Sequence, residues 1–262
     1  MTATPRPAAS SLSSAPPATG PLFRPAAERL HSQLDWLDSW HTFSFGSHFD
    51  PAWMGFGPLR VINDDTIAAG QGFGLHPHRD MEIITVMVEG QLNHRDSMGH
   101  SAVLRAGEVQ RMSAGTGIVH SETNEGDQPC RLLQIWIEPD ANGLPPAYEQ
   151  KPFPLEADWT PLIDPEGARG AMAIHRSARL WRARLAAGQT LALPAAPDQF
   201  GWLQLIDGDA QLPFGSDNAS AAAGMALTRG DGLGFTGAAA AAPIHALTAG
   251  PRGADLLWFA LS

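Results

Sequence analysis

The chain has 262 residues, of which 27 are glycine and 22 are proline, and its formal net charge is −10 at pH 7. Lys and Arg total only 17 and form no run, which excludes the basic surface that binds nucleic acid or anionic lipid. Frequent glycine and proline favour many short strands joined by turns over long helices.

Residues 1–22 consist mainly of Ala, Pro, Ser and Thr, and we expect them to form a disordered tail. This segment lacks the apolar core of a secretory signal, and no stretch of the sequence has the length and apolarity of a membrane span. Cys130 is the single cysteine, which excludes an intramolecular disulfide and fits a reducing compartment. The sequence therefore predicts a cytoplasmic protein, with Cys130 as a small buried residue.

Strands are predicted along the first half of the chain, where apolar and β-branched residues end at turn residues. Residues 59–63 form one such strand, which is expected to close at the turn-like Asn63-Asp64-Asp65. Residues 132–137 are apolar enough for a strand that is buried on both faces. The other predicted strands are residues 39–45, which could also be an extended arm, 81–88 and 102–104.

A weak internal repeat relates the two halves of the chain. Residues 83–90 can be laid on residues 201–208, and Ala106-Gly107-Glu108 can be laid on Arg229-Gly230-Asp231. A strand that ends in a turn, followed by a Gly-Glu or Gly-Asp turn, is typical of a cupin barrel. The repeat therefore predicts an all-β bicupin built from two jelly-roll-like barrels.

Two pairs of polar residues stand out by their spacing, His76-Pro77-His78 and His120-Ser121-Glu122. Residues two apart in a strand project from the same face, so each pair can direct two ligands into one barrel interior. Three imidazoles and one carboxylate suit Fe, Mn, Co, Ni, Cu or Zn. Glycines shortly before each pair allow the strands to bend around one ion. The sequence thus predicts one divalent metal site in the first half.

The carboxylate ligand has two candidates. Glu82 lies four residues after His78 and would share its face in a regular strand, as the general cupin pattern requires. Glu122 lies two residues after His120 and competes for the same position. Spacing alone leaves both candidates open.

Four segments together resemble the pirin family, most closely its bacterial members with quercetin dioxygenase activity. The likeness covers about residues 28–262 and is strongest over 36–150. The segments are Trp40-His41-Thr42-Phe43-Ser44-Phe45, Gly57-Pro58-Leu59-Arg60-Val61-Ile62-Asn63-Asp64-Asp65, His76-Pro77-His78-Arg79-Asp80-Met81-Glu82 and Met112-Ser113-Ala114-Gly115-Thr116-Gly117-Ile118-Val119-His120-Ser121-Glu122. In that family the metal is held by the His-Pro-His and His-Ser-Glu motifs. The resemblance therefore implies His76, His78, His120 and Glu122 as ligands, and it prefers Glu122 to Glu82.

The second cupin of this family has usually lost its metal site. Here the positions opposite His76 and His78 fall near Pro194 and Ala196, and His245 has no partner ligands. We expect a metal-binding cupin over residues 23–145, a connection over 146–169 and a metal-free cupin over 170–262.

The resemblance implies that the metal centre opens the central ring of flavonols such as quercetin, which consumes dioxygen and releases carbon monoxide. Fe(II) is the ion expected first, with Mn, Co, Ni, Cu and Zn as alternatives, and Glu122 is the expected catalytic base. Two other interpretations remain open. The protein could be a non-enzymatic, iron-sensing regulator that binds a transcription factor or enzyme partner. It could also be a detoxifying enzyme on another substrate, with flavonol cleavage as a side activity.

Apolar side chains near the motifs are candidates to line a site for a flat aromatic substrate, although core packing is the simpler role for each of them. These residues are Met54, Phe56, Phe73 and Met112. The remaining histidines receive no metal role, and His94 and His100 are expected to be exposed near a hairpin at residues 93–99. The histidines without an assigned role are His31, His41, His48, His94, His100, His175 and His245.

Overall fold

A computed structural model describes residues 21–194, 200–213, 224–237 and 246–262, so the predicted tail and His245 lie outside the described residues. Within these ranges the chain forms strands and turns, with two short 3-10 helices, η1 (Ala26–Glu28) and η2 (Ala168–Gly170). The all-β prediction is confirmed. No helix in the described ranges is long and apolar enough to cross a membrane.

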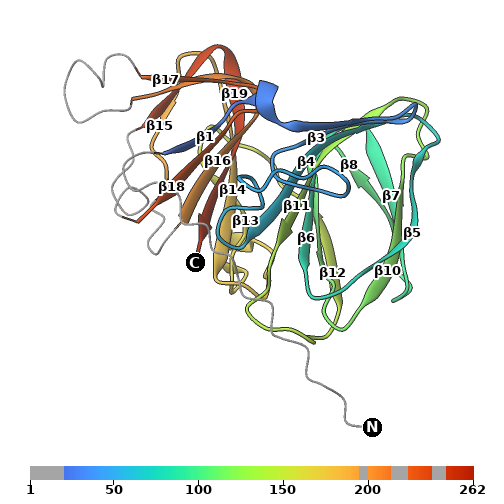
Figure 1. The fold of residues 1–262 in the computed structure, drawn as a ribbon. Helices are drawn as coiled ribbons and strands as arrows, with labels where there is room; N and C mark the ends of the chain where they lie inside the picture. Colours follow the sequence, from blue (N-terminus) through green and yellow to red (C-terminus); the bar gives the residue numbers. More distant parts are fainter. Residues whose placement is uncertain (1–20, 195–199, 214–223, 238–245) are drawn as a thin grey trace.

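The first barrel is made of two sheets that enclose a common interior (Figure 1). A seven-stranded sheet has the order β12-β9-β6-β11-β4-β3-β2, and a four-stranded sheet has the order β5-β10-β7-β8. The strands are β2 (Leu30–Gln33), β3 (Leu37–His41), β4 (Leu59–Ile67), β5 (Gly72–His78), β6 (Glu82–Glu89), β7 (Gln91–Asp96), β8 (Ser101–Arg105), β9 (Glu108–Ser113), β10 (Ile118–Thr123), β11 (Cys130–Ile137) and β12 (Ala147–Pro152).

The second barrel is a single sheet of the order β1-β18-β16-β19-β14-β13, with β15 beside β19 and β17 beside β16. All ladders in both barrels are antiparallel. Its strands are β1 (Leu22–Arg24), β13 (Thr160–Ile163), β14 (Ala178–Leu185), β15 (Thr190–Leu191), β16 (Phe200–Leu212), β17 (Met225–Thr228), β18 (Gly232–Thr236) and β19 (Leu247–Leu261).

A shared apolar core joins the two barrels. Strand β6 shows how one strand serves two cores, because its residues alternate between the faces of the sheet. Ile84 and Val86 pack in a cluster that also contains Trp202 and Leu257 of the second barrel. Ile83, Thr85 and Met87 have the opposite parity and face the interior of the first barrel. The run of apolar residues in β6 therefore reflects burial on both sides.

A buried ion network also crosses the junction, and it explains why one predicted turn is wrong. Strand β4 does not close at Asn63-Asp64-Asp65 but continues to Ile67. Arg131 on β11 donates from Nε and Nη2 to the carboxylate of Asp64, at 2.8 and 2.9 Å, and Nη2 also donates to the carbonyl of Ile206. Arg29 lies 3.8 Å from the same carboxylate. These tertiary contacts hold the acidic residues in the strand, against their local preference for a turn.

The chain crosses between the barrels at two places that bear on the predicted domain division. Strand β1 precedes the first barrel in sequence but pairs with β18 in the second. Strand β12 lies in the predicted connection and pairs with β9 in the first barrel. The division at 145 and 170 thus remains a prediction.

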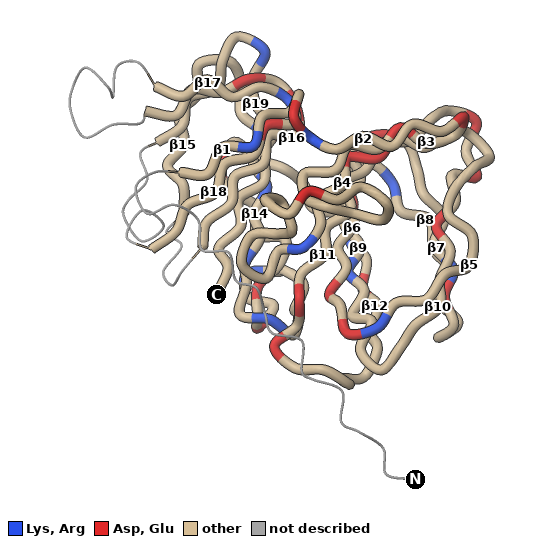
Figure 2. The backbone as a smooth tube through the Cα atoms, in the orientation of Figure 1, with Lys and Arg blue, Asp and Glu red and all other residues tan. Residues whose placement is uncertain are grey.

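The repeated turns do match, because Gly107 and Gly230 have φ values of 86° and 88°, a conformation that favours glycine. Figure 2 shows Lys and Arg spread among Asp and Glu in both barrels.

Candidate metal centre

Strands β5 and β10 place the two predicted ligand pairs side by side. In the antiparallel register His120 lies opposite His76, whereas Glu122 lies opposite Phe73, so two residues of β5 oppose Ser121. This bulge changes which side chains of β5 face Glu122. Gly72 fits the same strand pair closely, because a Cβ atom there would lie 2.3 Å from the carbonyl oxygen of Glu122. The glycine therefore permits the approach that positions the carboxylate strand.

Three histidines converge at this point. His76, His78 and His120 each offer a ring nitrogen, and these nitrogens all lie within 4.8 Å of one another. The ring centroids of His76 and His120 are 4.4 Å apart, and that of His78 is 4.8 and 4.9 Å from the other two. Nδ1 of His76 donates to the carbonyl of Gly74 at 2.7 Å, which leaves Nε2 for a ligand. This arrangement is the one expected of a metal site with imidazole ligands.

The electrostatics of the cluster also fit a cation. His120 is 1% exposed, and both of its ring nitrogens are buried without a hydrogen-bond partner. Burial, reinforced by neighbouring histidines, lowers the pKa of His120 to about 3 and that of His78 to about 4. Both rings are therefore neutral at physiological pH and present lone pairs. Unpaired polar atoms are costly in a protein interior, and coordination of a metal ion would satisfy one of the two nitrogens of His120.

Glu122 is buried beside His120 and held by two amide groups. Its Oε1 accepts a hydrogen bond from Nε2 of Gln110 at 2.7 Å, and its Oε2 accepts one from Nε2 of Gln134 at 2.8 Å. A carboxylate oxygen of Glu122 lies within 4.8 Å of nitrogens of His94 and His120. Glu122 thus shares His120 with the three-histidine cluster, but it is grouped with His94 rather than with His76 and His78.

Glu82 points elsewhere. Its carboxylate accepts a hydrogen bond from the Ser113 hydroxyl at 2.7 Å and lies 3.1 Å from Nδ1 of His175, in the segment between β13 and β14 of the second barrel. The parity argument assumed one regular strand from His78 to Glu82. In the structure β5 ends at His78, and β6 begins at Glu82 after a turn in which Asp80 has a φ of 51°. The turn resets the alternation, so Glu82 has the outward parity of Ile84 rather than the inward parity of Thr85.

A cavity of about 300 Å³ opens onto His76, His78 and Glu122. One part of its wall is apolar and contains Leu37, Phe45, Phe73 and Trp136. The other part is polar and contains Ser32, Ser39, His41, His48, Asn63 and Asp65. Of the apolar residues proposed from sequence, Phe73 lines this cavity. Phe56 and Met112 belong to core clusters, and Met54 is 39% exposed.

Asp65 is a buried acid in the polar wall, where its carboxylate accepts a hydrogen bond from Ser39. Burial raises its pKa from 3.8 to about 7, and the charges of Asp64 and Glu122 add to the effect. The folded state therefore binds a proton between these pH values that the unfolded state has released, so stability falls as pH rises through this window.

Replacing Asp65 with Asn should remove this pH dependence. We expect Asp65→Asn to be more stable than the wild type at pH 8 by on the order of 2–4 kcal/mol, because one pKa unit corresponds to about 1.4 kcal/mol. At pH 4 the two proteins should differ little. Urea unfolding of the metal-free proteins at both pH values measures the effect, and an equal difference at both would contradict it.

Three histidines near the site, His41, His48 and His94, were missed by sequence reasoning. His94 was expected to be exposed, but it is fully buried in β7 with its ring centroid 5.4 Å from that of His120. His41 lies in the cavity wall. Its Nδ1 donates to Oδ1 of Asn63 and its Nε2 accepts from the Ser32 hydroxyl, at 2.8 Å each. The alternation of β7 gave a signal for His94, since it shares the parity of the buried Leu92. His100, by contrast, is exposed as expected.

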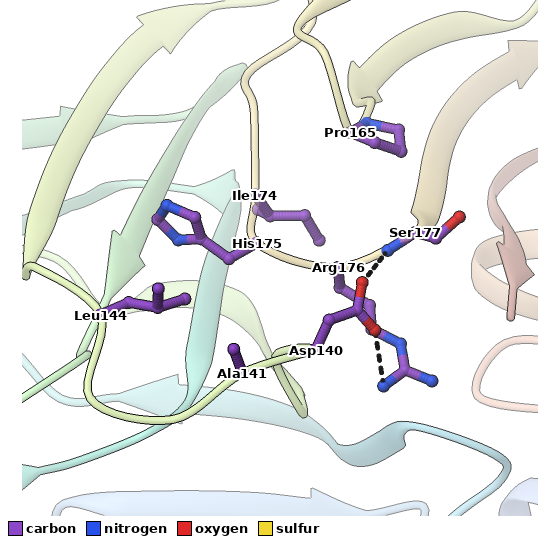
Figure 3. Close-up of a pocket in the computed structure, with 8 residues that line it drawn as sticks. All are labelled: Asp140, Ala141, Leu144, Pro165, Ile174, His175, Arg176 and Ser177. Atoms are coloured by element: carbon purple, nitrogen blue, oxygen red, sulfur yellow. Dashed lines mark hydrogen bonds and ion pairs between the residues drawn. The ribbon is translucent and has the colours of Figure 1, made fainter.

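A second cleft of about 320 Å³ lies at the junction of the two barrels, away from the histidine cluster (Figure 3). Asp140 accepts hydrogen bonds there from the backbone N–H of Ser177 and from Arg176. His175, the partner of Glu82, also lines it. The polar groups of this cleft connect the two halves of the chain, and they present no cluster of metal ligands among the described residues.

Comparisons with known proteins agree with this geometry. The sequence matches the family described as Pirin over residues 23–137 and the family described as Quercetinase C-terminal cupin domain over residues 162–261. These matches identify both barrels as cupins, as the internal repeat predicted. Both candidate ligand groups among the described residues lie in the first barrel. That the second barrel binds no metal remains a prediction.

Individual relatives cover most of the chain. Quercetin 2,3-dioxygenase of Escherichia coli K12 is 44% identical over 205 residues, which are 78% of this chain and 88% of the relative. A putative quercetin 2,3-dioxygenase of Mycobacterium bovis is 40% identical over 241 residues, 90% and 93% of the two chains. The crystal structure of the bacterial pirin YhhW from E. coli in complex with nickel(II) superposes with a TM-score of 0.81 at 39% identity, and covers 92% of this chain and 98% of that one.

Proposed function

Since the chain belongs to the pirin family, we propose that it is a metal-dependent cupin dioxygenase that cleaves flavonols such as quercetin. The observation that carries this proposal is the convergence of three partly or fully buried histidines, two of which, His76 and His78, line a cavity together with Glu122. A relative that bears the name quercetin 2,3-dioxygenase and a homologous structure with nickel(II) support it.

In this proposal His76, His78 and His120 hold one divalent ion, and Glu122 completes the ligand set from β10. Three nitrogens and one oxygen accept several first-row metals, with Fe(II) first among our expectations and Ni(II) supported by the homologous complex. The amides of Gln110 and Gln134 hold the Glu122 carboxylate in place, as residues around metal ligands commonly do. The hydroxyl of Tyr148 donates to Oε1 of Gln110, which directs the Gln110 amide N–H towards Glu122.

When bound, the metal acts as a Lewis acid that lowers the pKa of a coordinated hydroxyl group. Glu122 then serves as the general base, because its carboxylate lies at the metal side of the cavity and accepts a proton from the substrate hydroxyl. Phe45, Phe73 and Trp136 supply flat apolar surface for an aromatic ring system. Ser39, Asn63 and Asp65 also line the cavity and offer hydrogen-bond partners for substrate hydroxyls.

The test is turnover by protein that carries a measured amount of metal. We expect one equivalent of metal per chain after loading with Ni(II), Mn(II) or Fe(II), and loss of that equivalent in the double variant His76→Ala/His78→Ala. The loaded wild type should consume dioxygen, release carbon monoxide and bleach the flavonol absorbance of quercetin. A loaded protein without turnover would contradict the enzymatic proposal. A second equivalent that survives the double substitution would contradict a metal-free second barrel.

A regulatory role is the alternative function, and one observation favours it. Leu75 and Val119 are the chain neighbours of His76 and His120, and they are 77% and 40% exposed. Apolar side chains on the outer face of the ligand strands could contact a protein partner whose binding depends on the metal. In this case purified, metal-loaded protein would show no flavonol turnover, and it would bind its partner with an affinity that changes between the metal-free and metal-loaded forms.

A further inference from the structure

His94 is a buried histidine beside the proposed metal site that is not one of the proposed ligands. It lies on β7 directly opposite Glu122 of β10, and no part of it is exposed. Its Nε2 lies 3.1 Å from Oδ2 of Asp96, whereas its Nδ1 is buried without a hydrogen-bond partner. A buried imidazole with one satisfied and one unsatisfied nitrogen indicates a missing interaction at the second nitrogen.

The surroundings of Asp96 determine which nitrogen of His94 carries the proton. Oδ1 of Asp96 accepts the backbone N–H groups of Met98 and His100, at 2.9 and 3.0 Å, and Oδ2 also lies 2.9 Å from Nδ1 of His100. Two backbone N–H groups and two imidazoles thus converge on Asp96, an arrangement that suits an ionised carboxylate, which only accepts. His94 must therefore donate from Nε2, which leaves a lone pair on Nδ1.

His120, in turn, lacks an acceptor for the N–H of the ring nitrogen that does not bind the metal. A histidine that binds a metal through one nitrogen usually donates the N–H of the other to a fixed acceptor. Both ring nitrogens of His120 are buried and unpaired, and one of them lies within 4.8 Å of a nitrogen of His94 and an oxygen of Glu122. Each oxygen of Glu122 already accepts an amide hydrogen bond, and in the proposed site one of them also binds the ion. The free lone pair of His94 is thus the acceptor best placed for the His120 N–H.

We propose that His94 is a positioning residue of the metal centre, which accepts a hydrogen bond at Nδ1 from His120 and orients that ring on the ion. Asp96, His94 and His120 then form a chain from a buried carboxylate to the metal. Tyr148 holds the middle ring in place, since it stacks on His94 with a centroid distance of 4.5 Å. The inference rests on the proposed metal site, and it does not depend on flavonol cleavage.

Two substitutions of His94 separate the effect of the hydrogen-bond acceptor at Nδ1 from the effect of the packed ring. His94→Asn places an amide oxygen near the position of Nδ1 but gives up the ring, whereas His94→Phe keeps a stacking ring but has no acceptor. We expect His94→Phe to weaken the affinity for Ni(II) by about 10–100-fold and His94→Asn to stay within about 3-fold of the wild type. Competition with a chromophoric chelator measures both. In the Co(II)-loaded wild type, proton NMR should show a shifted, slowly exchanging N–H of His120 that His94→Phe lacks.

Asp96→Asn provides a second route should His94→Phe fold poorly. An Asn side chain that still accepts the two backbone N–H groups presents its NH₂ to His94, which moves the proton of His94 to Nδ1 and removes the acceptor. We expect the same loss of Ni(II) affinity with the His94 ring in place. His100→Gln is the matched control, because His100 also contacts Asp96 and stacks on Tyr148 but lies outside both candidate ligand groups.

Wild-type affinity in both His94→Phe and Asp96→Asn would overturn the inference. It would also be overturned if His94→Asn and His94→Phe both bound no metal while Glu122→Gln remained loaded, since His94 would then be a ligand itself. A wild type that binds Ni(II) but does not turn over quercetin would leave the inference standing and remove the enzymatic proposal. A wild type that binds no metal would remove both.

Discussion

Glu122→Gln is expected to abolish flavonol cleavage and to lower metal affinity by at least about 10-fold. The substitution keeps the shape of the side chain but removes the negative charge and the basic oxygen. It also places an NH₂ group among the amide N–H donors of Gln110 and Gln134. One of these amides would have to turn, and it would then lose its bond with Tyr148 or Thr85. Metal content and dioxygen uptake are the measurements.

The matched control for this prediction is Glu82→Gln. Glu82 is as deeply buried as Glu122, with both residues 2% exposed, but its partners are Ser113 and His175. We expect this variant to retain its metal and its activity. Circular dichroism of both metal-free variants separates loss of a ligand from loss of fold, since an unpaired buried donor costs about 1–3 kcal/mol. If Glu82→Gln emptied the site while Glu122→Gln stayed loaded and active, the assignment of the carboxylate would be wrong.

Asp64→Asn should be the most destabilising single substitution at the barrel junction. The Asp64 carboxylate faces Arg131 and Arg29, and the side chains of all three residues are less than 9% exposed. Without the carboxylate, two guanidinium groups remain buried close together. Removal of one partner from a buried ion pair costs about 3–5 kcal/mol when the remaining charge is uncompensated. The half-exposed Asp207, 3.3 Å from Arg131, remains as a partner here, so we expect the lower end of that range. Denaturant unfolding of the metal-free protein at pH 7 measures the change.

Arg252→Ala serves as the control for this substitution. Arg252 is paired with Asp209, but its side chain is 65% exposed, so water screens the interaction. An exposed pair of this kind contributes about 0–1 kcal/mol. A difference below about 1 kcal/mol between Asp64→Asn and the wild type would show that the network does not stabilise the junction.

The sequence predicted the histidine cluster well because the rule behind it is local. Side chains two apart in a strand share a face, and His76 and His78 as well as His120 and Glu122 follow this rule within one strand each. The rule failed between His78 and Glu82, because it does not show where a strand ends. The left-handed Asp80 turn interrupts the strand there, and nothing in Arg79-Asp80-Met81 distinguishes such a turn from a continuing strand.

The predictions that failed depend on contacts between distant segments. Asp64 and Asp65 were predicted to form a turn because acidic residues favour turns. Their burial in β4 is explained by distant partners, Arg131 and Arg29 for Asp64 and Ser39 for Asp65. His94 read as exposed because it lies near a hairpin, whereas Tyr148 and β10 cover it in the folded protein. In both cases the partner of a polar residue could not be identified from spacing, although the alternation of β7 gave a signal for the burial of His94.

The pairing of β1 with β18 imposes an order on folding during synthesis. Leu22 lies opposite Gly234, so the first strand to leave the ribosome finds its partner only after roughly 210 further residues. At a synthesis rate of about 5–20 residues per second, β18 follows β1 after about 10–40 s. During this time β1 has no partner strand for its backbone hydrogen bonds. The first barrel can form in this interval, whereas β1 cannot yet pair with β18 of the second barrel. A ribosome-stalled chain that ends before residue 232 should therefore leave residues 22–24 open to protease.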